Sequence, residues 1–168
     1  MVKRADRIQM HRREVVKNLT EQVKSLSESG AEPPIDEVRM FLQQELLPLV
    51  EAAESHLMPV VERVSGEAHE VSSMALDYEV VRRYVGDIQE LMYTLETGAG
   101  STERAQLEAD LRDKAIRLQA VVELLIEKES RVHLPLLEDH LLDEENERIA
   151  ERLIAGHRVI KLPDSERV

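Results

Sequence analysis

Four residues of this sequence carry side chains that bind metal ions and stand among apolar positions of predicted helices: His11, Glu54, Tyr78 and Glu129. Glu129 is the clearest case, because it interrupts a stripe of aliphatic residues spaced alternately by three and four positions. The stripe consists of Leu111, Ala115, Leu118, Val122, Leu125, Glu129, Val132 and Leu136. A lone buried carboxylate costs several kcal/mol unless it is paired, hydrogen-bonded or bound to a metal. We therefore expect its partners on the other helices.

An imidazole, two carboxylates and a phenol that meet at one point are ligands for a single Fe(III), Mn or Zn ion. His11, Glu54, Tyr78 and Glu129 therefore predict a pocket for one metal ion. A metal-free network accounts for the same residues: the His11 imidazolium pairs with Glu129, and the Tyr78 hydroxyl donates to a carboxylate. His133, four residues after Glu129 on the same helix face, is either a further ligand or an ordinary surface histidine. The residues alone leave these alternatives open.

Five helices must position these side chains, and capping residues, glycines and prolines predict their limits. We expect helices over about residues 4–29, 36–64, 68–97, 101–139 and 144–156. Gly30 ends the first helix, Asp36 caps the second, and Pro48 and Pro59 bend the second. The positions of the first helix expected to face the core are Ile8, His11, Val15, Leu19, Val23 and Leu26. Those of the second helix are Met40, Leu42, Leu46, Leu49, Val50, Ala53, Leu57 and Val60. Those of the third helix are Val71, Met74, Tyr78, Val81, Val85, Ile88, Met92 and Leu95.

Short turns between long amphipathic helices predict an up-down-up-down four-helix bundle with a short C-terminal fifth helix across its end. In antiparallel neighbours, two residues lie at the same height when their midpoint falls in the connecting turn. The midpoint of His11 and Glu54 falls in the turn GAEPP, and that of Glu54 and Tyr78 falls on Gly66. Tyr78 and Glu129 are offset by about one helical turn, roughly 5 Å. We therefore expect all four side chains near one cross-section of the core.

An internal repeat relates the second and fourth helices. Residues 49–62 (LVEAAESHLMPVVE) and 125–138 (LIEKESRVHLPLLE) share Leu, an aliphatic residue and Glu, followed at equal spacing by Pro, two aliphatic residues and Glu. Glu54 precedes its proline by five residues, whereas Glu129 precedes its proline by six. This difference of one residue corresponds to about 100° of rotation around a helix. Glu54 is therefore the predicted site residue whose direction fits the repeat least well.

The composition fits a single domain of 168 residues, with a core over about residues 5–155 and a tail over 160–168. Apolar residues make up 42% and charged residues 33%, with one Phe and three Tyr, which favours the all-α class. The formal charge of −12 argues against nucleic acid and anionic membranes as partners, because both require clustered Lys and Arg. A cation or a basic partner fits this charge better, and the possible partners are a metal ion, a small diatomic ligand, a second copy of the chain or another protein. The chain has no Cys and no long apolar run, so we expect a cytoplasmic protein without thiolate sites.

The whole pattern resembles the haemerythrin-like (HHE cation-binding) domain family, whose members are four-helix bundles with a non-haem di-iron centre. The resemblance covers roughly residues 5–155 and rests on four stretches, one per helix. These stretches are MHRREVV, FLQQELLPLVEAAESHLMPVVE, MALDYEVVRR and LLIEKESRVHLPLLEDHLLDEE. The phrase that ends in Met-Pro or Leu-Pro after an acidic turn occurs twice and is the most specific part.

Family members take one ligand His from the first helix, a His and a Glu four apart from the second, a His from the third, and a second His and Glu pair from the fourth. The corresponding positions in this sequence hold His11, Leu49, Ala53, Tyr78, Leu125 and Glu129. Only His11 and Glu129 keep the residue type of the family. The resemblance therefore implies a di-iron pocket in which most ligands are substituted.

The function implied by this resemblance is that of a binding or sensing protein whose degenerate pocket holds a single iron ion and takes oxygen, nitric oxide or peroxide. The alternative is a metal-free structural or interaction module that kept the bundle and lost the metal chemistry. Two further interpretations are a peroxide-consuming iron enzyme and a haem site in the apolar space that Leu49, Ala53 and Leu125 leave beside His11 or Tyr78. The sequence does not decide whether the chain is an enzyme.

Overall fold

Helices account for every element in the part of the chain that the computed structural model describes, namely residues 4–28, 32–98 and 100–155. The predicted all-α class is therefore confirmed. None of the helices in these ranges combines the length and apolar character needed to cross a membrane. The predicted helix end at Gly30 and the predicted tail over 160–168 lie outside the described residues.

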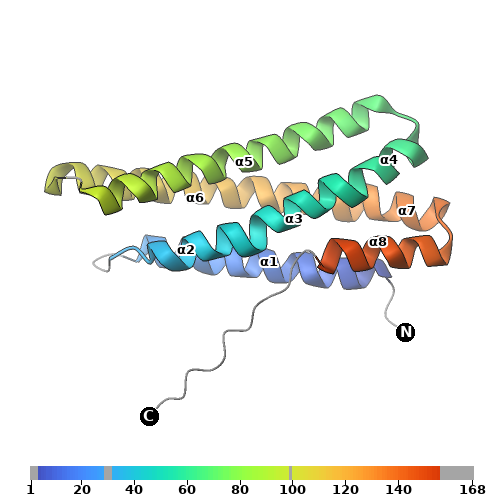
Figure 1. Ribbon diagram of the computed structural model, residues 1–168, viewed down its shortest axis with the longest axis horizontal. Helices are drawn as coiled ribbons and strands as arrows, with labels where there is room; N and C mark the ends of the chain where they lie inside the picture. Colours follow the sequence, from blue (N-terminus) through green and yellow to red (C-terminus); the bar gives the residue numbers. More distant parts are fainter. Residues whose placement is uncertain (1–3, 29–31, 99, 156–168) are drawn as a thin grey trace, which may run out of the picture.

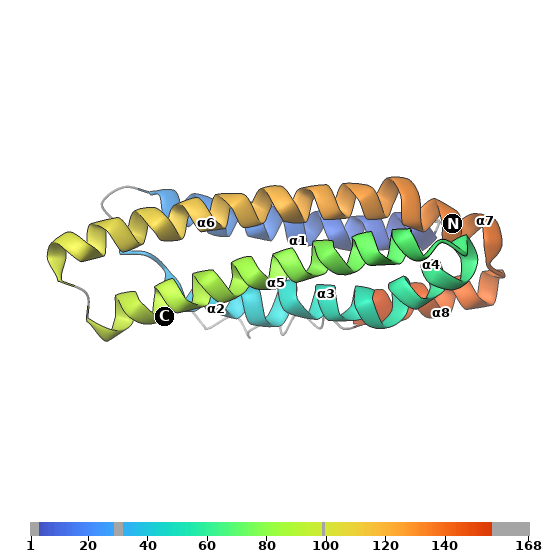
Figure 2. The ribbon, with the colours of Figure 1, turned by 90° about the horizontal axis from the view of Figure 1, so that it is seen from above.

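Four long helical segments lie alongside one another, and a short helix returns along one end (Figures 1 and 2). The first is α1 (Arg4–Ser27) and the third is α5 (Ala68–Thr97). The second comprises α2 (Ile35–Phe41), η1 (Leu42–Leu46), α3 (Leu47–Ala52), η2 (Ala53–Leu57) and α4 (Met58–Ser65). The fourth comprises α6 (Ser101–Lys128), η3 (Glu129–His133) and α7 (Leu134–His140), and α8 (Asp143–Ala155) follows it. Consecutive long segments run in opposite directions, and α8 packs against α1, α3 and η2.

Glycines in the left-handed backbone region end two of the segments, as the sequence predicted. Gly66 follows α4 with a φ of 64°, and Gly98 follows α5 with a φ of 117°. Side chains with a Cβ rarely adopt this conformation, so glycine is the residue that ends a helix in this way at low cost. The observed limits of α5 are the predicted ones.

The predicted cap at Asp36 is wrong. α2 begins one residue earlier, at Ile35, and Pro34 occupies the capping position without a side-chain hydrogen bond to the helix. The ring of Pro34 holds φ at −78°, close to helical values, so the chain enters the helix directly after it. Asp36 instead accepts a hydrogen bond from Arg39 within the first turn.

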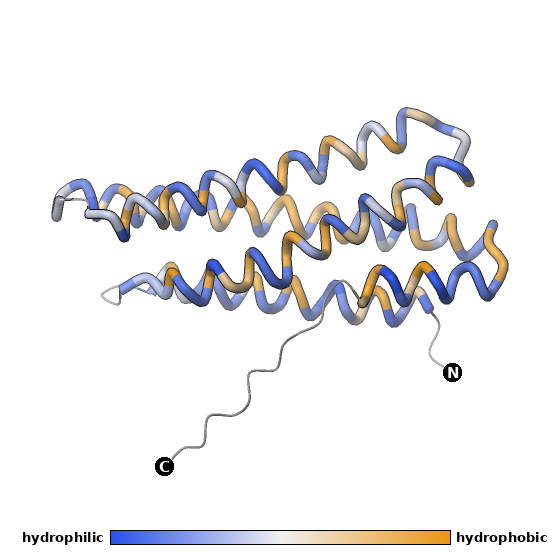
Figure 3. Tube along the Cα trace, in the orientation of Figure 1, coloured by the Kyte–Doolittle hydropathy of each residue, from blue (hydrophilic) through white to orange (hydrophobic). Residues whose placement is uncertain are grey.

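The core extends along all four segments, and the apolar positions recur with the helical period in each of them (Figure 3). The stripe predicted for α5 is confirmed from Met74 to Leu95, whereas Val71 at its beginning is only partly buried. The apolar stripe of α1, from Ile8 to Leu26, is confirmed as well. Neither helix contains a proline, so the simple period of an α-helix predicts which side chains point inward.

Three π-helical segments interrupt the second and fourth long segments, and each ends two residues before a proline. They are η1 before Pro48, η2 before Pro59 and η3 before Pro135. In each, the N–H of the residue preceding the proline bonds to a carbonyl five residues back: Leu47 to Leu42, Met58 to Ala53 and Leu134 to Glu129. A proline has no backbone N–H to donate, and its ring crowds the carbonyl four residues back. The wider π turn relieves this clash.

The π segments shift the side chains after them to a different face. Val132 and Leu136 were predicted to face the core, but Val132 is 43% exposed and Leu136 is only partly buried. His133 and Leu137 are buried instead, because the extra residue in the π turn of η3 rotates the following chain. In the second segment Val60, which follows η2, is likewise only partly buried, and Val61 is buried instead. Met40 was also predicted to face the core but is 41% exposed; it precedes η1, and the buried residues beside it are Val38 and Phe41.

A deletion can test this shift. Deletion of Ser130 removes the extra residue of η3, and Pro135→Ala removes the proline ring that requires it. The shortened chain can then continue as a regular α-helix in which the same side chains face inward. We expect a melting temperature within about 5 °C of the parent by circular dichroism. Removing Ala120 from the regular part of α6 rotates the following chain by about 100° and should lower the melting temperature by more than about 10 °C. Equal losses for both variants would contradict the account of η3.

Candidate functional site

Glu129 is buried as its stripe predicted, and its partner is Arg12 of α1. The Arg12 Nε–H donates to Glu129 Oε1 at 2.9 Å, and each residue is 1% exposed. Arg12 Nη1 also lies 3.5 Å from the backbone carbonyl oxygen of Leu153, to which it donates from beneath α8. The pair therefore joins α1 to the first residue of η3, and α8 covers it.

His11 lies beside Arg12. Its ring is partly buried, and Nδ1 lies 3.3 Å from Nη1 of Arg12. A guanidinium can only donate, so Nδ1 of His11 accepts this hydrogen bond. A chain of contacts thus runs from His11 to Arg12 to Glu129.

Tyr78 of α5 is buried in the same region, with 2% of its surface exposed. Burial is the main reason that the pKa of its hydroxyl is raised above the ordinary value of 10.0. The negative charge of Glu129 raises this pKa further, while the positive charge of Arg12 lowers it. The phenol is consequently held in its neutral form, which can donate a hydrogen bond but is a poor metal ligand.

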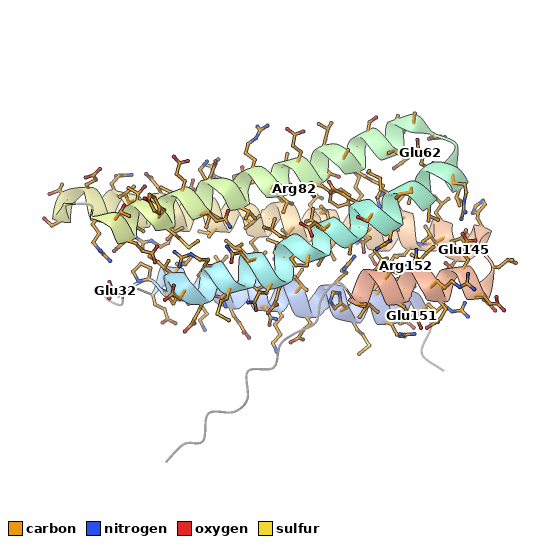
Figure 4. All side chains as sticks on the ribbon, in the orientation of Figure 1. Glu32, Glu62, Arg82, Glu145, Glu151 and Arg152 are labelled. Atoms are coloured by element: carbon orange, nitrogen blue, oxygen red, sulfur yellow. The ribbon has the colours of Figure 1, made fainter. Side chains whose placement is uncertain are left out.

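Glu54 is partly exposed and pairs with an arginine, and its negative charge also raises the pKa of Tyr78. Both of its carboxylate oxygens accept hydrogen bonds from Arg82 of α5, which Figure 4 labels, and its side chain is 26% exposed. The residue that the internal repeat aligns with Glu129 is Ala53, the first residue of η2, and Ala53 is fully buried. Glu54 follows it by one residue, so its side chain is rotated by about 100° toward the surface.

His133 is buried, which the sequence did not predict. It is 3% exposed, and its Nε2 lies 3.6 Å from Oε2 of Glu70, while neither ring nitrogen makes a hydrogen bond with the described residues. Burial lowers the pKa of His133 below its ordinary value of 6.5, against the opposing charges of Glu129 and Glu70. In the internal repeat its position corresponds to Leu57, which is also fully buried.

A small cavity adjoins the ion pair. Its volume is about 40 Å³, and Arg12, Glu129 and Ser130 are among the residues that line it. Nη2 of Arg12 and Oε2 of Glu129 are buried without a hydrogen-bonding partner in the described part of the protein. The cavity is large enough for a water molecule, which can accept from Nη2 and donate to Oε2.

The arrangement does not fit a di-iron centre. The guanidinium of Arg12 binds one carboxylate oxygen of Glu129, and its positive charge opposes a metal cation at the same carboxylate. Leu49, Ala53 and Leu125, at three positions where the resembling family has ligands, are buried apolar residues. Within the described ranges, no three His, Cys, Asp or Glu side chains are grouped closely enough to hold a metal ion.

Arg12 is the site residue that sequence reasoning missed, although a signal was present. It lies four residues after Ile8 and three before Val15, so it fits the apolar stripe of α1 as well as His11 does. Its positive charge also complements a buried carboxylate, whereas His11 was selected for its ability to bind metal. Charge complementarity across the core would have selected Arg12.

The chain was also compared with protein-family models, with curated proteins and with solved structures, and none of them matches it. The resemblance to the haemerythrin-like family therefore rests on the sequence stretches quoted above.

Breaking the buried pair from either side should be costly. Arg12→Met leaves Glu129 as an uncompensated buried charge, so we expect a loss of about 3–5 kcal/mol in the free energy of unfolding, measured by urea denaturation. Arg12→Met combined with Glu129→Leu removes both charges and should recover most or all of that loss. Arg13→Met, at an exposed neighbouring position, is the matched control and should change stability by less than about 0.5 kcal/mol. A double variant as unstable as the single variant would contradict the pairing.

The lowered pKa of His133 predicts a pH dependence of stability. When the pH falls through 6.5, the unfolded chain takes up a proton at His133 that the folded chain does not, so the protein loses stability from 6.5 down to the lowered pKa. His133→Leu removes this term, and denaturation between about pH 7 and about pH 5.5 should then show a smaller loss than in the parent. His69→Gln, at a side chain that is 80% exposed, should keep the parent slope. An unchanged slope in His133→Leu would show that the site does not hold a neutral imidazole.

Proposed function

We propose that this chain is a haemerythrin-like, up-down-up-down four-helix bundle that works as a metal-free interaction module. In this proposal the Arg12–Glu129 ion pair takes the place of the metal centre. The observation that carries it is the guanidinium of Arg12, which lies 2.9 Å from Glu129 with 1% of the residue exposed. A fixed positive charge on the protein itself thus satisfies the carboxylate for which a metal was expected.

The alternating directions of the four long segments support the bundle part of the proposal. Further support comes from η2 and η3, which are each followed by Met-Pro or Leu-Pro. The internal repeat of the sequence therefore corresponds to a repeated backbone geometry. Glu129 and Ala53 begin these two equivalent π segments. The proposal treats Glu129 as the one carboxylate ligand retained and Arg12 as the residue that compensates for the missing metal.

The charge and the packing of the buried side chains argue against the metal-binding and haem alternatives. A metal ion on Glu129 would lie beside the buried positive charge of Arg12, which opposes its binding. A haem beside His11 or Tyr78 requires space that Leu49 and Leu125 fill as members of the packed core. We therefore favour the module over an iron sensor, a haem protein or a peroxide-consuming enzyme.

Metal loading tests the proposal directly. Purified protein incubated with Fe(II), Mn(II) or Zn(II) and then desalted should retain less than about 0.1 equivalent of metal per chain by elemental analysis, because the buried positive charge of Arg12 opposes a second cation at Glu129. The protein should also be colourless, and chelator treatment should leave its melting temperature unchanged.

Stoichiometric metal would overturn the proposal in favour of a metal-binding or sensing protein. A visible tyrosinate-to-Fe(III) band that is lost in Tyr78→Phe would additionally identify Tyr78 as a ligand. Ser72→Ala, at an exposed position on the same helix, is the control for changes unrelated to the pocket.

A further inference from the structure

We propose that the groove between α8 and the second long segment binds a small organic anion, one that carries a carboxylate or phosphate group on an apolar body. Ser55 and His56 of η2 lie on one side of this groove, and Arg148 and Arg152 of α8 lie on the other. Figure 4 labels Arg152 and Glu145 on α8. Neither Arg12 nor Glu129 lines this groove, so ligand binding here does not depend on their ion pair.

The charge of the groove differs from that of the chain as a whole. The sequence has 34 acidic residues against 22 Lys and Arg, yet the groove presents two guanidinium groups and one imidazole against one carboxylate, that of Glu145. That carboxylate already accepts a hydrogen bond from Arg63 of α4, so its charge is compensated. A net positive site on an acidic protein selects for anions, because the rest of the surface repels them.

The two arginines belong to the minority of described arginines that form no ion pair. Most arginines in the described ranges form an ion pair with a carboxylate, whereas Arg148 and Arg152 form none there. They are four residues apart in α8 and therefore lie on the same helix face, where two like charges oppose each other. An oxyanion between them would offset that repulsion, and the planar fork of each guanidinium matches the geometry of a carboxylate or phosphate.

The size and walls of the groove define the rest of the ligand. Its volume is about 330 Å³, which lies within the range of small-molecule sites rather than of a single inorganic ion. Pro59, Val60 and Ile149 supply apolar surface, and Ile149 belongs to the core cluster, so the base of the groove is rigid. The Ser55 hydroxyl and the His56 ring can each give one further hydrogen bond. The ligand is thus an anion with a compact apolar part.

The π segment η2 places Ser55 and His56 at this position. Because Pro59 widens the turn before it, these residues project at an angle that a regular helix would not give them, while Leu57 stays in the core. α8 contacts η2 and α3 directly, so the two sides of the groove are held at a fixed separation. The groove is therefore formed by packed helices and not by a loop.

Nuclear magnetic resonance titrations of the full chain test the proposal with phenyl phosphate and with benzoate, which share an aromatic ring and differ in the anionic group. We expect saturable shift changes in residues 55–60 and 145–152 with a dissociation constant on the order of 1 mM for the better of the two probes. The comparison of the two probes tells whether the site prefers a phosphate or a carboxylate. Benzyl alcohol, which has the ring without the charge, should give no saturable change in these residues.

The double variant Arg148→Gln/Arg152→Gln should weaken binding at least tenfold, because it removes both guanidinium groups and keeps two good helix formers. Arg83→Gln/Arg131→Gln changes the net charge equally at exposed arginines of α5 and η3 and should bind as the parent does. The proposal is overturned if neither anion gives saturable changes, if the changes map elsewhere in the unaltered protein, or if benzyl alcohol binds as tightly as the anions. It is equally overturned if the groove variant binds as the parent does.

Discussion

The buried ion pair between Arg12 and Glu129 is the constraint on which the interior of this protein depends. Two full charges lie in a core whose other buried residues are mostly apolar, and an unpaired buried charge is far more costly than a paired one. The pair fixes the height of α1 relative to η3, since a single Nε–H of Arg12 must reach a single oxygen of Glu129. It also ties α8 to this level through the carbonyl of Leu153. Such a pair adds little net stability compared with apolar residues of the same volume, so its main effect is on which packing of the helices is allowed.

Glu129 stands where the regular spacing of α6 ends and a proline-dependent π segment begins. Glu129 is the first residue of η3, and its carbonyl accepts the bond from Leu134 that the following Pro135 makes necessary. The same backbone geometry occurs at η2, where Ala53 takes the equivalent place and Pro59 follows. One repeated element thus serves two purposes in the two halves: at η3 it presents a charge to α1, and at η2 it presents a small side chain to the core and polar residues to the groove beside α8.

The sequence predicted those parts of the fold that depend on regular periodicity. The limits and the inward face of α5 follow from the spacing of its apolar residues, and the burial of Glu129 follows from its place in the stripe of α6. The exchange of Val132 and Leu136 for His133 and Leu137 could not be predicted in this way, because a π turn adds a residue that a count at α-helical spacing does not include. The position of Glu54 was anticipated in part, since the repeat already showed that it is offset by one residue from Glu129.

The partner of Glu129 was missed for a different reason. His11 and Arg12 fit the same stripe, and a search for metal ligands favours the histidine, whereas the energetics of burial favour the residue of opposite and permanent charge. His133 was missed because an i, i+4 spacing from Glu129 describes a surface pair as well as a buried one. The spacing of apolar residues therefore predicted much of the interior of this chain. It did not predict which buried charges pair, because pairing depends on opposite charge and not on spacing.

The most direct test of this account is hydrogen exchange at the Arg12 side chain, followed by nuclear magnetic resonance of the arginine Nε–H groups. We predict one Nε–H signal that exchanges with solvent far more slowly than those of the exposed arginines, that shows contacts to protons of η3, and that disappears in Arg12→Met. If all arginine Nε–H signals exchange at rates typical of exposed guanidinium groups, Arg12 is not enclosed beside Glu129, and the claim that an ion pair replaces a metal centre in this core is contradicted.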